Sequence, residues 1–145
     1  MKSLNYFIIP TVKEKKQQAD TVNTIRALSA LGVPKKKILL VFNKVEVDEE
    51  VRSEFASMFG LAELEKSFTL KPEAVIYANE VYERLKTVGK SLSDVVTDET
   101  DYRQKLRDTA DAAEKEHCVK MVALKRLAVT ATKNLDDVHR ALFGK

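Results

Sequence analysis

Two short, unbroken runs of apolar residues in the first third of the chain predict buried strands. The first is 6–9, which ends at Pro10, and the second is 38–42. Unbroken runs of this length are typical of strands buried on both faces, as in a parallel sheet. Apolar residues recur at three-residue steps between them, at Ala19, Val22, Ile25, Leu28 and Leu31. This spacing predicts a helix that ends at Gly32, and a strand, a helix and a strand in this order predict a right-handed βαβ unit.

The same alternation continues through the middle of the chain. Apolar residues at helical spacing occupy 51–59, and 68–70 predicts a short strand that Pro72 interrupts. A third apolar run at 74–77 precedes another helical pattern. Repeated strand, turn and helix are typical of α/β proteins. We therefore predict an α/β fold with three layers over residues 1–96, in which helices cover both faces of a short, mostly parallel sheet of three or four strands.

The pattern changes after residue 96, because neither glycine nor proline occurs again until Gly144. Apolar and small residues recur every three or four positions, at Tyr102, Leu106, Ala110, Ala113, His117, Met121, Leu124 and Ala128. This predicts one long helix over 99–130, or two helices with a kink, in a C-terminal segment, 97–145, packed on the core. Asn134 is predicted to cap a last short helix. A helix of roughly 45 Å exceeds what a small sheet can cover, so its surplus either meets a partner or folds back as a hairpin near 130–134.

Composition excludes several classes of site. The single cysteine, Cys118, and two histidines exclude a zinc site of paired cysteines, and no metal-ligand spacing or catalytic constellation is present. The four glycines are far apart, which excludes a glycine-rich phosphate loop. No apolar run approaches the roughly 20 residues of a membrane span. One cysteine suits a reducing compartment, so we expect a cytoplasmic protein that does not enter a membrane.

Charge is distributed unevenly along the chain. Residues 1–45 have nine lysines and arginines against two acids, 46–116 have ten against eighteen, and 117–145 have six against two. The net charge is +3, with basic ends and an acidic middle. Two interpretations remain open, which are solvated helix faces and a basic surface that meets nucleic acid or an acidic partner. Within the long helix, the basic residues Lys120, Lys125 and Arg126 are the candidates for such a surface.

Polar residues that follow two predicted strands are candidates for a ligand site. Asn43, Lys44 and Glu46 follow the second apolar run, at the sheet edge where open α/β sheets bind ligands. An asparagine amide offers a donor and an acceptor, which suits a purine edge, and a lysine stem can lie along a base. The alternative is a polar turn in which the asparagine bonds to the backbone. Asn79 follows the third run, either as a second wall of that pocket or as a helix cap.

Six spaced motifs resemble one protein family. In chain order they are Tyr6-Phe7-Ile8-Ile9-Pro10-Thr11-Val12, Lys16-Gln17-Gln18-Ala19-Asp20-Thr21, Leu31-Gly32-Val33-Pro34, Val41-Phe42-Asn43-Lys44-Val45-Glu46, Ala78-Asn79-Glu80-Val81-Tyr82-Glu83-Arg84 and Thr100-Asp101-Tyr102-Arg103. They resemble the plasmid stability protein StbB, a group of P-loop proteins related to the ParA/MinD partition ATPases. The likeness extends over about 4–142, most of the chain. It implies a bacterial protein of plasmid partition and maintenance that also bears on conjugative transfer.

The chain departs from that family at its chemistry. Family members bind ATP and Mg²⁺ through a glycine-rich loop and an acidic motif, and neither is present here. The sequence therefore resembles the C-terminal part of such a protein, with a partial P-loop NTPase fold. The resemblance implies a base site at Asn43, Lys44, Glu46 and Asn79, adenine as the base, and a DNA-binding protein of the plasmid as partner. It leaves open whether the chain is part of an ATPase or a non-catalytic module that binds such a partner, nucleic acid or a second copy of itself.

We expect this chain neither to hydrolyse ATP nor to bind Mg-ATP more tightly than about millimolar, because the backbone donors and the lysine of a phosphate loop provide most of the hold on a triphosphate. Calorimetric titration with Mg-ATP measures this affinity. A micromolar dissociation constant would contradict the expectation.

Overall fold

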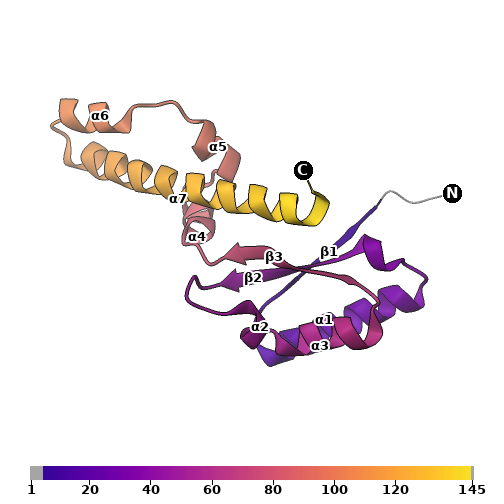
Figure 1. Cartoon of the computed structure of the whole chain (residues 1–145). Helices are drawn as coiled ribbons and strands as arrows, with labels where there is room; N and C mark the ends of the chain where they lie inside the picture. The colour runs from indigo at the N-terminus through magenta and orange to yellow at the C-terminus, as the bar shows by residue number, and fades with distance from the viewer. Residues whose placement is uncertain (1–4, 145) are drawn as a thin grey trace. The chain divides into compact units, whose positions relative to one another are not determined.

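A computed structural model describes residues 5–144 of the chain, and these form two compact units. The first comprises 5–78 together with 134–144, and the second comprises 79–133 (Figure 1). The apolar pattern alone places a boundary after residue 96, between 1–96 and 97–145. Residues 1–4 and 145 of those predicted segments lie outside the described part.

The first unit is built on a parallel sheet with the strand order β1-β2-β3. Its elements are β1 (Phe7–Thr11), α1 (Lys15–Ala30), the 3-10 helix η1 (Lys35–Lys37), β2 (Ile38–Val45), α2 (Val51–Glu54), α3 (Ala56–Glu65), β3 (Thr69–Tyr77) and the last turns of α7 (Ala112–Phe143). The predicted α/β fold with a short parallel sheet and a C-terminal helix is confirmed.

Both faces of this sheet are covered. On one face, Ile38, Leu40 and Phe42 of β2 pack with residues of α1 and α3, which lie side by side in Figure 1. On the other face, Val41 of β2 and Ala74 of β3 pack against the end of α7, whose buried residue there is Val138. The first unit therefore has the three layers that the alternating pattern predicts.

Strand β1 differs from the prediction, because it is not buried on both faces. It lies at an edge of the sheet, and Phe7 and Ile8 are 41% and 52% exposed. Ile9 packs against the core, and Pro10, which has no N–H to donate, is tolerated in an edge strand. An apolar run indicates a strand but does not distinguish an edge from the centre of a sheet, which explains the error.

Helix α1 buries the middle of the predicted stripe, since Ile25 is in the core and Val22 and Leu28 pack against it, but it also buries two polar residues. Its buried residues are Gln18, Thr21 and Ile25, whereas Ala19 and Leu31 are exposed. The Gln18 amide is fully bonded, since Nε2 donates to the carbonyls of Lys13 (2.8 Å) and Glu54 (3.1 Å) and Oε1 accepts from Ser57 (2.6 Å). These bonds offset the cost of burying a polar group, so a polar residue occupies a position that hydrophobicity alone assigns to solvent.

Strand β3 continues past Pro72, which is predicted to interrupt it. In its register with β2, Leu40 pairs with Leu70 and Phe42 with Val75. Two steps along β2 therefore correspond to five along β3. The additional residues, among them Pro72, leave the regular pairing as an irregular bulge, where a residue without an N–H costs no ladder bond.

Helix α7 is continuous where a turn is predicted. It runs through 130–134 to Phe143, and the break lies instead at 109–111, after α6 (Tyr102–Asp108). Asn134 is therefore not a cap. Its Nδ2 donates to the carbonyl of Val75 (2.8 Å) and its Oδ1 accepts from the N–H of Tyr77 (2.9 Å). One amide thus pairs with two backbone groups of β3, as a neighbouring strand would.

The second unit is helical. It comprises α4 (Val81–Val88), α5 (Leu92–Thr97), α6 and the first part of α7. Its buried core is formed by Val81, Leu85, Val95, Met121, Leu124, Ala128 and Ala131. Between residues 5 and 144, no helix combines the length and the apolar character that crossing a bilayer requires.

We expect Asn134→Ala to lower the free energy of unfolding by about 1–2 kcal/mol, because both backbone groups of β3 lose their partner. Asp136→Ala, an exposed change on the same helix, is the matched control and should shift stability by less than about 0.5 kcal/mol. Urea denaturation followed by circular dichroism measures both. Equal stability of the two variants would show that the amide does not stabilise the first unit.

Candidate functional site

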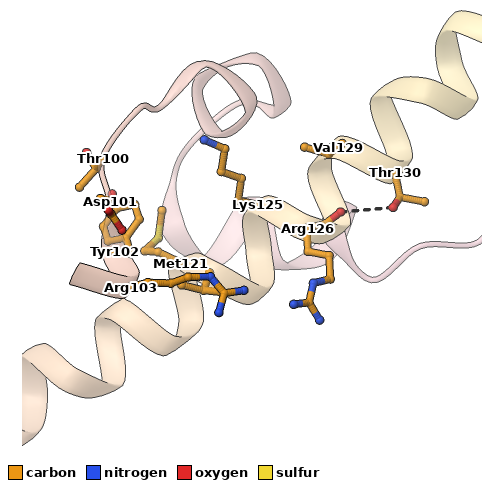
Figure 2. Close-up of a pocket in the computed structure, with 10 residues that line it drawn as sticks. Thr100, Asp101, Tyr102, Arg103, Met121, Lys125, Arg126, Val129 and Thr130 are labelled. Atoms are coloured by element: carbon orange, nitrogen blue, oxygen red, sulfur yellow. Dashed lines mark hydrogen bonds between the residues drawn. The ribbon is translucent and has the colours of Figure 1, made fainter. Parts of the chain in front are cut away.

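A basic groove on the second unit is the candidate site. It has a volume of about 430 Å³ and lies between α7 and the segment at the start of α6 (Figure 2). Its lining residues are Thr100, Asp101, Tyr102, Arg103, Met121, Val122, Lys125, Arg126, Val129 and Thr130. The two sides come from 100–103 and 121–130, which are distant in the sequence. We call this hollow the basic groove.

Asp98 organises the turn that forms one side of the basic groove. Its Oδ1 accepts from the N–H of Thr100 (3.0 Å) and its Oδ2 from the hydroxyl of Tyr102 (2.6 Å). Hydrogen bonding by Thr100 and then by Tyr102 holds the pKa of Asp98 well below its usual range. The Asp98 carboxylate in turn raises the pKa of the Tyr102 phenol. Asp101 then begins α6, because its Oδ1 accepts from the N–H of Gln104 (3.0 Å).

Lys125 joins the two sides of the basic groove. It is half-buried, and its Nζ donates to the carbonyl of Asp98 at 2.5 Å. In Figure 2 its side chain extends away from those of Arg103 and Arg126. The lysine that the sequence offers as a surface cation therefore holds the Asp98 turn against α7, and its ammonium is engaged there.

Arg103 and Arg126 are the free cations of the basic groove. Within residues 5–144, neither guanidinium has a hydrogen bond or an ion pair to a side chain or carbonyl. The one carboxylate of the lining, Asp101, is engaged as the cap of α6. Two arginine forks are therefore available to an anionic group, which they can bind in bidentate geometry.

The structure separates the three predicted surface cations. Lys125 and Arg126 line the basic groove, whereas Lys120 lies 3.5 Å from Glu116 in an i,i+4 ion pair. Lys120 lines a second hollow of about 360 Å³, together with Arg84, Thr87, Val88, His117, Met121 and Leu124. Sequence reasoning missed Arg103. Its position directly after the capping turn of α6 is a signal that could have indicated it.

Asn43 and Lys44 form a bulge within β2. The strand continues to Val45, beyond the predicted end at Phe42, and three steps along β2 pair with two along β3 between Phe42 and Val45. Lys44 has a left-handed backbone (φ 55°), and its N–H donates to Oδ1 of Asn43 at 2.9 Å. The extra residue returns Val45 to the core face of the sheet. Asn43 therefore bonds to the backbone, as the interpretation of this segment as a polar turn expects. Binding of a base by Asn43 and Lys44 stays a prediction.

Glu46 and Asn79 also have local partners. The N–H of Glu46 donates to Oε1 of Glu49 (2.8 Å) and so closes the turn after β2. Asn79 belongs to the second unit, where its Oδ1 accepts from the N–H of Val81 (2.8 Å) and its Nδ2 donates to the carbonyl of Leu127 (3.3 Å). The cap position of α4 is Glu80, so Asn79 bonds one residue before the helix cap, and its amide is engaged at both ends.

The first unit has a hollow of its own, of about 520 Å³, beside the start of α1. Two of its polar groups are paired, since Lys13 Nζ lies 2.6 Å from Glu49 and Gln18 makes the three bonds described above. Among the described residues, no three histidine, cysteine or acidic side chains gather as metal ligands would. The basic groove is the better candidate, because two arginines, Arg103 and Arg126, have no partner there within the described residues.

Comparison of the chain with protein-family models, with curated proteins and with solved structures finds no match.

We expect Asp98→Asn to lower the melting temperature at pH 7, because an amide cannot accept both bonds as a carboxylate does. A lowered pKa stabilises the folded state above the unfolded-state value of about 4 and loses that contribution as the pH falls below it. The difference between the two proteins should therefore shrink below about pH 4. Glu99→Gln, the same charge change at an exposed neighbour, is the control. A difference that is independent of pH would contradict the role assigned to the Asp98 carboxylate.

Proposed function

We propose that this chain is a bacterial plasmid-maintenance protein of the StbB type that acts as a non-catalytic interaction module in the cytoplasm. In this proposal the basic groove receives a plasmid-associated partner. The spaced motifs support the biological setting, and the basic groove supports the mode of action. ATP and Mg²⁺ belong to the resembled family, and the proposal includes no hydrolytic step for this chain.

One observation supports the choice of the groove above all. The chain has seven arginines, and five of them have partners in the structure. Those five are Arg26 with Glu65, Arg84 with Glu80, Arg140 with Asp137, Arg107 with Gln104 and Arg52 over the ring of Phe59. The two arginines for which residues 5–144 offer no such partner, Arg103 and Arg126, line the same groove.

Unpaired arginines in one hollow suit a binding surface. Arginine is enriched among the residues that dominate protein interfaces, and its planar fork pairs with carboxylates and phosphates. The floor beside these arginines is apolar, with Val122 and Val129. A surface that binds only phosphates needs no such floor, so a protein partner fits better than nucleic acid.

We expect the double variant Arg103→Glu and Arg126→Glu to lose plasmid maintenance, because two like charges then face the partner's acidic groups. The gene is deleted from its native replicon and restored as wild type or variant, and plasmid-bearing cells are counted over generations without selection. Lys35→Glu with Lys36→Glu, the same charge change at exposed positions of the first unit, is the control.

Three outcomes are informative. Loss in the groove variant with retention in the control supports the proposal. If deletion of the gene leaves plasmid retention unchanged, the maintenance function is wrong. If the groove variant restores retention fully, the protein acts through another surface.

A further inference from the structure

Helix α7 has a second stripe, of valines and cations, that lies outside the core of the second unit. Its residues recur at alternating steps of three and four, at Val119, Val122, Arg126, Val129 and Lys133. These are the a and d positions of a heptad pattern, the spacing by which helices pack side by side. Val119 and Val129 are 54% and 51% exposed, although valine gains by burial.

This open stripe is separate from the buried one. Met121, Leu124, Ala128 and Ala131 of the same helix lie in the core of the second unit. At 100° per residue, the centre of the open stripe lies on the opposite side of the helix from the centre of the buried one. The first part of α7 therefore has one apolar face that the core covers and a second face on which three valines alternate with two cations. Val122, Arg126 and Val129 of the open stripe also form part of the basic groove.

The charges of this part of α7 indicate what covers the open stripe. Residues 117–133 include four lysines and arginines and no acid. Arg126 and Lys133 occupy two of the five stripe positions, and Arg103 adds a third cation at the rim of the groove. Acidic side chains on a partner would complement this surface, and like charges would be repelled.

A second copy of the chain fits the open stripe poorly. In a parallel pair, Arg126 would face Arg126 of the second copy and Lys133 would face Lys133. In an antiparallel pair that brings Val119 opposite Val129, each Arg126 would face Val122 and Lys115 would face Lys133. Charged a positions of one sign disfavour both homodimers, whereas a partner of complementary sequence avoids the conflict.

We propose that the occupant of the basic groove is an acidic amphipathic helix of a partner protein, which packs along α7 in heptad register with glutamates or aspartates opposite Arg126 and Lys133. This inference rests on the proposed function and specifies its partner. Val119, Val122 and Val129 supply the apolar contact, and the cations select the partner by charge. The mode is that of a helix laid into an amphipathic groove.

Two matched synthetic peptides test the proposal. The acidic peptide has three heptads with leucine at the a and d positions, except for glutamates at two a positions seven residues apart, and in the basic peptide lysines replace those glutamates. We expect fluorescence anisotropy to show binding of the acidic peptide to the full chain at least about tenfold tighter than that of the basic peptide. The double variant Val119→Ser with Val129→Ser changes exposed positions. It should weaken binding of the acidic peptide by a similar factor without unfolding the protein.

A charge swap makes the test specific. The variant Arg126→Glu with Lys133→Glu should reverse the preference, so that it binds the basic peptide better than the acidic one. Circular dichroism checks that each variant is folded. A duplex DNA oligonucleotide and sedimentation of the chain alone test the two other occupants.

Each result decides the inference. A reversed preference in the swapped variant supports it. Equal binding of the two peptides, preferential binding of the duplex through Arg126, or self-association that Val119→Ser and Val129→Ser abolish would each overturn it. The proposed function survives those results if the groove variant still fails to maintain the plasmid, so the two failures are distinguishable.

Discussion

Strand β2 needs an apolar cover on both of its faces, and the rest of the first unit depends on this constraint. Every residue from Ile38 to Phe42 is buried, and their alternation sends Ile38, Leu40 and Phe42 to one face and Val41 to the other. A central parallel strand can be satisfied only by helices on both sides. The βαβ segment supplies α1 and α3 for the first face. The second face is covered by residues near 138, which follow the whole second unit in the sequence.

Helix α7 meets this demand and, in its first part, serves the second unit. Its residues 112–133 supply four of the seven buried residues of the helical core, and residues within 134–143 cover one face of the sheet. Asn134 stands where the role changes, and its amide satisfies two backbone groups at the free edge of β3. A helix that contributes to one core on one side cannot bury its other sides there as well, because 3.6 residues per turn distribute its side chains around the whole axis. The open stripe is on the side of α7 away from the core of the second unit.

Sequence patterns were sufficient to predict the class of fold and most elements. A strand buried on both faces gives an unbroken apolar run, and an amphipathic helix gives apolar residues at a period of 3.6. They failed where the burial of a residue depends on hydrogen bonds of its polar group or on the position of its strand at the edge of the sheet. Gln18 is buried because three specific bonds satisfy its amide, and β1 is exposed because it is an edge strand. Of the candidate site, Arg126 was named from charge alone. Arg103 was missed, and the bond of Lys125 to the Asp98 carbonyl was not foreseen. Both depend on contact between α7 and the Asp98 turn, which are distant in the sequence.

The discontinuous first unit has a consequence for the order in which the protein is made. Ala74 and Val138, which pack together, are separated in the sequence by the whole second unit. At about 5–20 residues per second, a ribosome needs several seconds to add the intervening chain. During that time one face of the sheet is synthesised and uncovered, while the second unit, whose segments are contiguous, already has all its own core residues before the sheet is closed. The first unit is thus the last to receive all its core residues, and the Val41 and Ala74 face of its sheet lacks its cover until the chain has been made past residue 138.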